Sequence, residues 1–550
     1  MSQPNRSLLG TLVLKELHDL VLTLRFSIGT ALTLVLAILA AYIGSLDYNA
    51  RLSSYQTKLK LNHDWLARSA VYSFLQPTVV RPPEPLSILN HGLEGRLGTD
   101  FPISIETETT EAEGQNRGNE YLAIFSEVDL TVIVAVILGL VAVLFTFDAL
   151  CGEREAGMLK LVMSYPLSRS QFLLGKYLGA WLALMIPATL ACMLSLMVME
   201  FTAQVHFGSQ EIVRIALIFA LFALYLSSML LAGLVVSSLT QRSSVALVFS
   251  TFAWFFFVTI VPNLATMIPD FAGDRPRIYQ QARERLAQVD KEQDTAYKKL
   301  QDPRDPESAM PRDPMALYYY AINNSSNGWT GFECHFGDAK YYDKLRDFFG
   351  QLIPFTLRLA SKRADIWREY VRYRYHQAAL ARGISFLSPT AVFRNNVTFL
   401  SGTSEVDYGH FIDLASRYRN TFLNYLQGKN AFNSWRWFTT DFDDGDRPWT
   451  EIVAGKTADE MAASGKKPED VLNQWLHDRV AFAKFLQAEM EREKRTDRRL
   501  PLGDLPAFRY ARIGTGEVLV HAAPEIAFLM IVNLVLFLVV FTRFVRYDVR

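Results

Sequence analysis

Six long apolar segments constrain the fold of this chain more than any other feature of its sequence. Each has about 20 or more residues dominated by apolar side chains, the length that an α-helix needs to cross a bilayer. The segments cover residues 26–46, 129–149, 176–200, 212–238, 244–266 and 523–543. The first is too long for the apolar core of a signal peptide. The sequence therefore predicts an all-α polytopic membrane protein with six transmembrane helices.

Charge and cysteine content argue against two broad classes of protein. The 56 Lys and Arg residues balance the 56 Asp and Glu residues, so the net charge at pH 7 is zero and no nucleic-acid partner is indicated. The three cysteines, Cys151, Cys192 and Cys334, are too few for a disulfide framework. We expect isolated thiols and no nucleic-acid binding.

Basic residues near the ends of the apolar segments predict the orientation, because such residues favour the cytoplasmic side. They gather on one side if the N-terminus is cytoplasmic: Lys15, Arg25, Arg154, Lys160, Arg169, Lys176, Arg242, Arg543, Arg546 and Arg550. We therefore expect both termini in the cytoplasm, with residues 47–128 and 267–522 outside it. Residues 1–25 carry polar side chains between leucine-rich turns and predict a cytoplasmic interfacial helix. Residues 523–550 would form the sixth transmembrane helix and a short tail.

The two outer regions differ in their patterns. Residues 47–128 begin with helical spacing that continues the first span until Pro82 and Pro83 interrupt it, and residues 101–109 alternate like a strand. Residues 267–522 predict a large, mainly helical extracytoplasmic domain with strands at most at its periphery. Its helices are expected at 274–300, 341–382, 408–426 and 468–494.

Patterns for catalysis are weak throughout the chain. Gly455, Lys456 and Thr457 resemble the end of a phosphate-binding loop, but Thr450 stands where such a loop requires glycine. The histidines have no metal-ligand spacing. No apolar segment has an ionisable residue at its centre, which disfavours a proton-driven carrier or a charged pore. We predict no catalytic site, metal or cofactor in this chain, so the energy must come from elsewhere.

The polar stretch 147–177 separates the second and third spans. A charge cluster at Glu153, Arg154 and Glu155 precedes one or two apolar helical turns, which Pro166 ends. Ser168 is a candidate cap for the next helix. A short helix of this kind at about 152–168, within the unit 129–266, suits docking of a soluble partner, since apolar knobs can fill a groove while charges fix the register. A simple connector between spans is the alternative.

This stretch, "CGEREAGMLKLVMSYPLSRSQFLLGKYLG", resembles the signature of type-2 ABC exporter permeases. The matching positions are Glu153, Arg154, Glu155, Gly157, Leu159, Ser164, Pro166, Ser168, Arg169, Gly175 and Lys176, whereas Met158 stands where many members have threonine. Two further stretches, "RPPEPLSILNHGLEG" and "FLSPTAVFRNNVTFLSGTSEVDYGHF", resemble a subgroup with large periplasmic insertions. The resemblance spans nearly the whole chain.

The resemblance implies a mechanism and partners. The short helix would be the coupling helix that enters a cleft of a separate ABC ATPase subunit, which is present in two copies and binds ATP and Mg. The implied coupling residues are Glu153, Arg154, Glu155, Gly157, Met158, Leu159, Ser164, Pro166 and Arg169. A second permease, either the same chain or a sister, would complete the unit in the inner membrane of a bacterium.

In this family the second and fifth spans usually line the exit path. That implies a translocation path along Val134, Leu138, Phe145, Phe252, Trp254, Phe256 and Val258. These side chains are apolar or aromatic and favour a hydrophobic or amphipathic cargo, such as membrane lipids; simple packing between helices is the alternative.

Two other functions remain open at the level of sequence. The large region 267–522 also suits mechanotransmission, in which ATP hydrolysis inside the cell reshapes the outer domain to act on a periplasmic protein and nothing crosses the membrane. A membrane-anchored scaffold without ATPase coupling is a further reading, against which the coupling-helix pattern argues.

Overall fold

The computed structural model describes residues 8–113, 128–159, 168–205, 207–272, 275–301, 318–324, 329–335, 339–440 and 499–546. Within these ranges, 6 helical segments are long and apolar enough to cross a membrane. They are Leu24–Arg68, Leu130–Glu155, Arg169–Thr202, Ser209–Leu239, Ser243–Pro269 and Thr515–Val545. The prediction of a mostly helical chain with six long apolar helices is confirmed.

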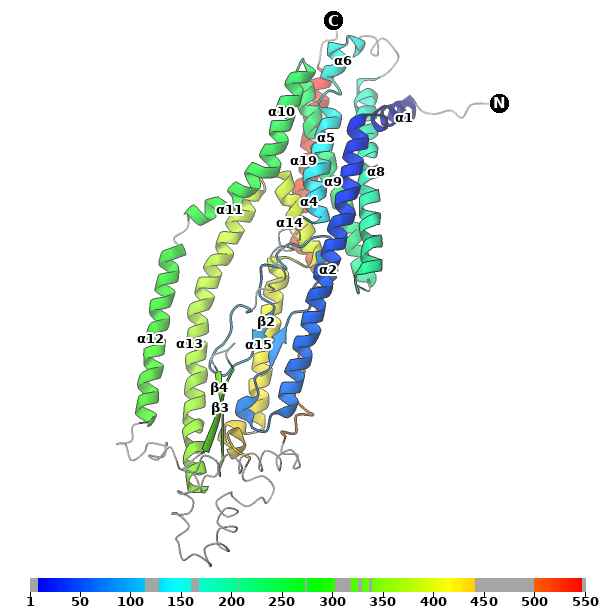
Figure 1. Cartoon of the computed structure of the whole chain (residues 1–550). Helices are drawn as coiled ribbons and strands as arrows, with labels where there is room; N and C mark the ends of the chain where they lie inside the picture. The colour runs from blue at the N-terminus through cyan, green and yellow to red at the C-terminus, as the bar shows by residue number, and fades with distance from the viewer. Residues whose placement is uncertain are drawn as a thin grey trace, which may run out of the picture.

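These segments form one bundle (Figure 1). In order they are α2 (Leu24–Arg68), the series α4 (Leu130–Ile133), η3 (Val134–Leu138) and α5 (Gly139–Thr146), then α8 (Arg169–Thr202) and α9 (Ser209–Leu239), the series α10 (Ser243–Phe255), η4 (Phe256–Ile260) and α11 (Val261–Ala272), and α19 (Thr515–Val545). A separate helix α1 (Leu8–Val21), short α6 (Cys151–Glu155) and the last turn of α19 lie at the same end, here called the α6 end.

Small side chains allow the bundle helices to approach closely. The buried face of α2 consists largely of Gly29, Thr33, Ala37, Ala41 and Ser45. Small residues at such positions let two helix backbones pack without a gap, which is how apolar helices associate when lipid offers them an equally apolar environment. The Thr33 and Ser45 hydroxyls donate to carbonyls one turn earlier, so neither polar group is left unpaired.

The helix α2 extends well beyond a single membrane crossing. Its 45 residues correspond to about 67 Å at the usual rise per residue. Thr23 caps its start, where the Thr23 hydroxyl accepts from the Phe26 amide, and the helix ends at Arg68. The predicted continuation of the first span as a long projecting helix is confirmed.

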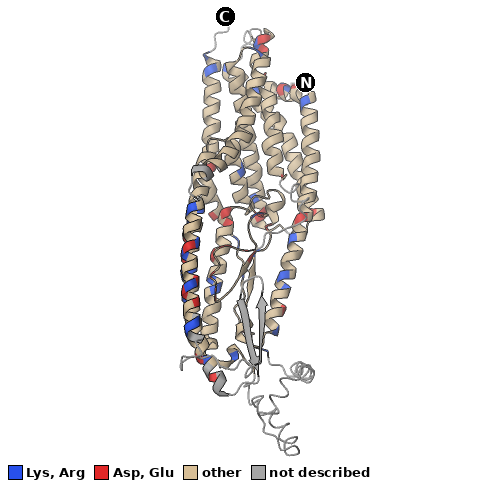
Figure 2. Ribbon diagram, turned by 60° about the vertical axis from the view of Figure 1, so that its left-hand side comes forward, with Lys and Arg blue, Asp and Glu red and all other residues tan. Residues whose placement is uncertain are grey.

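The remaining elements form a domain at the opposite end of the bundle, here called the domain end (Figure 1). Its long helices are α12 (Arg275–Gln301), α13 (Ala339–Ser385) and α15 (Glu405–Gly428), which agree with the helices expected at 274–300, 341–382 and 408–426. The helix predicted at 468–494 lies outside the described residues. Figure 2 shows charged residues along these helices and toward both ends of the bundle.

Short strands accompany these helices. β1 (Thr78–Val80) pairs antiparallel with β2 (Asp100–Pro102), so only the start of the strand predicted at 101–109 forms one. A second pair, β3 (Tyr318–Asn324) with β4 (Trp329–His335), was not expected from the sequence. Short turns complete the elements: η1 (Tyr72–Phe74), η2 (Pro85–Ile88), η6 (Ala431–Asn433) and η7 (Trp435–Trp437).

The helix α14 (Pro389–Ser401) occupies a place that the sequence did not predict. It belongs to region 267–522, yet its buried face packs against α9 and α19 of the bundle. The Phe393 ring stacks on Tyr225 of α9 with centroids 4.4 Å apart and meets Phe222 edge-on. Part of the domain is therefore built into the core of the bundle.

The turn after α14 locks the domain to the residues that follow α2. Gly402, with a φ of 73°, ends α14 and accepts a hydrogen bond from Arg81 through its carbonyl. The Leu93 amide donates to the next carbonyl, that of Thr403, over 3.0 Å. Gly92 is needed at this contact, because its φ is 52° and a Cβ there would lie 2.2 Å from Thr403 Oγ1.

Gly92→Ala is therefore expected to destabilise the chain by about 2 kcal/mol or more, from the positive φ together with the clash. Thermal unfolding in detergent measures the effect. Gly503→Ala is the matched control, since a Cβ at Gly503 meets no atom within 4 Å. Equal melting temperatures for the two variants would contradict the proposed role of Gly92.

Candidate functional site: the element between the second and third spans

The second span passes directly into α6 at one end of the bundle. Leu150 and Cys151 are fully buried there, and their backbone amides both donate to the Ser237 hydroxyl of α9, over 2.9 and 3.1 Å. A side-chain acceptor at the start of a helix satisfies amides that have no partner within the helix. The hydroxyl of α9 therefore fixes where α6 begins.

Glu153 connects this element to two other helices. Its carboxylate lies 2.5 Å from Lys176 Nζ on α8, and Lys176 also pairs with Glu16 of α1 over 3.2 Å. The Lys176 side chain is only 12% exposed, so the cation is enclosed between two carboxylates. Such an enclosed pair holds its members in place because separating them leaves an uncompensated buried charge.

Two glycines of α8 bring α1 close enough for this ion pair. A Cβ on Gly179 would lie 2.6 Å from Glu16 Cβ, and one on Gly175 would lie 3.0 Å from Leu12 Cβ. Glycines four residues apart form the small-residue face on which helices pack closely in membranes. This spacing around Lys176 is the signal that could have revealed the docking of α1 from the sequence.

The neighbouring charges bind the ends of three other helices. Arg154 donates to the carbonyls of Ser238 and Thr240 at the end of α9, and Arg169 donates to the Val545 carbonyl at the end of α19. Glu155 accepts from the Ser243 amide at the start of α10, over 2.9 Å. Cations thus meet helix C-termini and an anion meets an N-terminus, which is the favourable arrangement for helix dipoles.

After α6, the two neighbouring apolar residues Met158 and Leu159 differ in their exposure to solvent. Gly157, with a φ of 68°, turns the chain after α6. Leu159 is 3% exposed and packs with Phe172 and Leu173, whereas Met158 is 51% exposed. Ser164 and Pro166 lie outside the described residues.

The charged residues predicted for partner contact therefore bind helices of the bundle in this structure, and among them the Glu155 side chain is exposed. Sequence reasoning located Glu153, Arg154 and Glu155 at the right turn but did not foresee that each binds a different helix. Among the members of the predicted set that the structure describes, Met158 presents an apolar side chain outward.

Comparison with known proteins identifies the family. A family model described as "ABC-2 family transporter protein" matches residues 11–549. The chain belongs to the ABC-2 family of transporter proteins. The match confirms the resemblance to type-2 ABC permeases and identifies the chain as a multi-span membrane protein of the permease type.

Two curated proteins are similar to parts of this ABC-2 protein. It is 34% identical over 146 residues to the probable ABC transporter permease protein NosY of Pseudomonas aeruginosa, a match that covers 24% of this chain and 48% of that protein. It is 51% identical over 45 residues to the protein of the same description from Stutzerimonas stutzeri, covering 8% and 16%. The match thus spans about half the length of the first relative.

The residues predicted for a translocation path fall into two groups in this ABC-2 protein. Val134, Leu138 and Phe145 are at most 3% exposed and lie in cores of the bundle. Phe252 and Phe256 are 61% and 37% exposed on α10 and η4, and their rings stack with centroids 6.4 Å apart. In this conformation only the second group lies on an accessible surface.

Trp254 and Val258, also predicted for the path, turn away from that surface. Val258 is buried, and Trp254 borders a cavity of about 10 Å³ between α5, α9 and α10. Within the described chain, Trp254 Nε1 and the Ser250 hydroxyl at this cavity have no hydrogen-bond partner. The space is about that of one water molecule.

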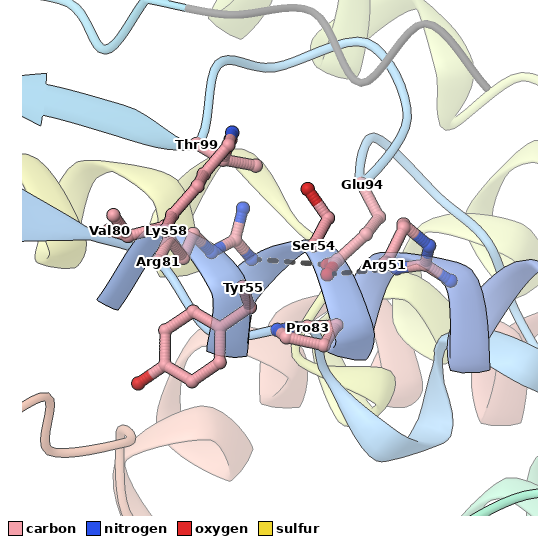
Figure 3. A pocket seen from close by; sticks show the side chains of 9 residues that line it. All are labelled: Arg51, Ser54, Tyr55, Lys58, Val80, Arg81, Pro83, Glu94 and Thr99. Atoms are coloured by element: carbon pink, nitrogen blue, oxygen red, sulfur yellow. Dashed lines mark hydrogen bonds and ion pairs between the residues drawn. The ribbon is translucent and has the colours of Figure 1, made fainter. Parts of the chain in front are cut away.

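A second small cavity lies beside the domain end of α2. It measures about 20 Å³ and is lined by Arg51, Ser54, Tyr55, Lys58, Val80, Arg81, Pro83, Glu94 and Thr99. Arg51 and Arg81 converge on Glu94, at 3.2 and 3.3 Å (Figure 3). Lys58 pairs with Asp100 over 2.8 Å. The cations are paired, so this ABC-2 protein uses the cluster to bind α2 to the loops.

Metal-ligating groups are not clustered in the part of the chain that the structure describes. No set of three or more His, Cys, Asp or Glu residues there could hold a metal ion. Of the cysteines, Cys151 and Cys192 are buried free thiols, and the side chain of Cys334 is outside the described set.

Proposed function

We propose that this ABC-2 protein is the permease subunit of an ATP-driven exporter that moves a hydrophobic or amphipathic molecule out of the cytoplasm. A separate ABC ATPase, in two copies, would bind ATP and Mg and dock at the α6 end. The observation that carries the proposal is the attachment of the short helix α6 to α8, α9 and α10 through Glu153, Arg154 and Glu155. The start of α8 extends this attachment, because Lys176 pairs with Glu16 of α1 and Arg169 binds the end of α19.

The attachment supports force transmission rather than a passive connector. A push on α6 reaches α8 and α1 through Lys176, and it reaches α9 and α10 through the helix-end contacts of Arg154 and Glu155. With α19, which Arg169 at the start of α8 binds, five helices would move together when the ATPase closes. A simple connector needs no such set of paired charges.

The proposed cargo follows from the exposed face of α10 and η4. Phe249, Phe252 and Phe256 are 59%, 61% and 37% exposed there, and all three side chains are uncharged. Such a face suits lipid tails or an amphipathic molecule. A second permease, either the same chain or a sister, would complete the path in the inner membrane of a bacterium, with both termini cytoplasmic.

Mechanotransmission is the second candidate, and the continuity of α2 favours it. This one helix joins the packing face against α8 to the Arg51 and Arg81 cluster of the domain. Tilting α2 at the α6 end would displace the domain, which would then act on a periplasmic protein without cargo movement.

Met158→Asp tests the docking surface. Placing a charge at an apolar contact removes the burial of a methionine, so binding of the ATPase should weaken about 30-fold or more. Co-purification from native membranes with quantified ATPase stoichiometry measures the effect. Met158→Leu is the control and should bind like the unaltered chain.

The same purification separates the candidate functions. An ATPase together with an enriched lipid or peptide supports export, and an ATPase with a periplasmic protein and no cargo supports mechanotransmission. Full binding of the ATPase by Met158→Asp would refute docking at this residue. Absence of any ATPase would refute both candidates.

A further inference from the structure

Two of the apolar spans are interrupted by a π-helical turn. Val134–Leu138 (η3) interrupts the second span, and Phe256–Ile260 (η4) interrupts the fifth. A π turn adds a residue to one helical turn and leaves backbone carbonyls without their regular partner. Such turns are frequent at helix kinks and at functional sites. Both turns are bound by side chains from elsewhere.

Tyr225 of α9 binds the first of these turns. Its hydroxyl donates to the Ala135 carbonyl over 2.7 Å, deep in the bundle where Tyr225 is fully buried. The same hydroxyl lies 3.3 Å from Thr390 Oγ1 on α14, and the ring stacks on Phe393. Tyr225 therefore joins η3 to α14.

Ser388, which caps α14, binds the second turn. Its hydroxyl donates to the Phe257 carbonyl of η4 and accepts from the Ala391 amide over 3.2 Å. Ser388 is fully buried, so water cannot replace these bonds. One end of α14 thus contacts both interrupted spans, and α14 lies beside α4 and α19 in Figure 1.

Gly139 provides the space for this arrangement. It directly follows η3, and a Cβ there would lie 2.7 Å from Tyr225 Oη and 3.7 Å from Trp254 Nε1. A methyl group at this position would press the Tyr225 hydroxyl away from its acceptor.

We propose that Tyr225, Ser388 and Thr390 form a joint that couples the two π-helical turns to α14, so that bending of the second and fifth spans moves the domain attached to α14. These are positioning residues, since they act through the backbone of η3 and η4. The inference deepens the proposed function and rests on it for the source of the motion. The junction of Gly402 and Thr403 with Arg81 and Leu93 then passes the movement from α14 to the domain.

Hydrogen exchange on the full chain in nanodiscs tests the joint without any partner. In Tyr225→Phe the ring and its stacking remain while the bond to Ala135 is lost. Amides of η3 and of the first turn of α14 should both exchange about fivefold faster, which is the rate ratio expected when one hydrogen bond is lost. Tyr177→Phe is the matched control, because it removes a hydroxyl bond to Ser227 that touches neither π turn.

A second variant tests the joint sterically, without removing a hydrogen-bonding group. Gly139→Ala should give the same paired increase, whereas Gly383→Ala, where a Cβ meets no atom within 4 Å, should not. A rise at η3 with no rise at α14 would overturn the joint. So would equal effects of the Tyr225 and Tyr177 variants.

The same measurement with the ATPase bound shows what the joint transmits. ATP should change exchange at η3, η4 and α14 in the unaltered complex, and in Tyr225→Phe the change at α14 should fall about fivefold while that at η3 persists. An unchanged response of α14 would overturn the inference. An ATPase that does not bind the unaltered chain refutes the proposed function, whereas the exchange of the chain alone still decides whether the joint exists.

Discussion

Lys176→Met is expected to destabilise the chain by about 3–5 kcal/mol, the usual cost of breaking a buried ion pair by removing one member. The substitution keeps most of the length of the side chain but leaves Glu16 and Glu153 facing each other without the cation that lies 3.2 and 2.5 Å from them. Burial already raises the pKa of Glu16, so an unpaired carboxylate there is unfavourable. Thermal unfolding in detergent measures the loss.

The loss should extend to function, because this ion pair joins α1, α6 and α8. ATP hydrolysis by the bound ATPase should no longer respond to the permease. The triple variant Lys176→Met, Glu16→Gln, Glu153→Gln is the control, since it removes all three charges together and should regain most of the stability. A single variant as stable as the unaltered chain would show that the pair contributes nothing.

Much of the bundle could be predicted from sequence because its signal is local. A span of about 20 apolar residues is recognisable without knowing its neighbours. The same holds for α12, α13 and α15, whose helical periodicity extends over many turns. These elements agree with expectation to within a few residues.

The helix α14 could not be predicted in the same way. Its 13 residues mix Val392, Phe393 and Leu400 with Arg394 and two asparagines, a pattern too short and too polar to indicate a helix packed in a bundle. Its environment is supplied by Tyr225, Phe222 and the face of α19, which are far away in sequence. Tertiary contacts decide its place, and no local rule reports them.

The candidate site could be predicted from the sequence only in part, for a different reason. The sequence identified the turn that carries Glu153, Arg154 and Glu155, but it did not show which way these side chains point. Their acceptors and donors are mostly backbone groups at the ends of α9 and α10, and such groups leave no trace in side-chain patterns. The docking role of this set stays a prediction, and Met158 and Glu155 are among its exposed members.

Stability is expected to fall as the pH rises from about 4.5 to 7, and Glu84 should contribute a large part of this change. Its side chain is 4% exposed, and burial raises the pKa of the carboxyl group to about 7 although Arg512 lies 2.9 Å away. The charged and titratable groups around it are Arg512, Glu94, Arg81, Asp407 and Tyr510. Desolvation outweighs the attraction of Arg512, so the native state favours protonated Glu84.

The sign follows from proton uptake. Between the unfolded pKa of 4.5 and the folded pKa of about 7, the native state binds more protons than the unfolded state. The contribution of Glu84 is therefore complete below about pH 4.5 and is lost as the pH rises through 7, a change of about 3 kcal/mol. Burial also raises the pKa of Asp129, the cap residue before α4, to about 6, which adds a change of comparable size and the same sign.

Glu84→Gln should reduce this slope by the contribution of one carboxyl group, because glutamine keeps the shape of the side chain and does not titrate. Denaturant unfolding in detergent between pH 4.5 and 8 measures it, and Asp64→Asn, at a carboxylate that is 43% exposed, is the control. The residual slope in Glu84→Gln should be that of Asp129 and the other buried carboxyls. If the slope were instead unchanged, Arg512 would hold Glu84 ionised throughout, and this contact would join the C-terminal linker before α19 to η2 as a permanent ion pair.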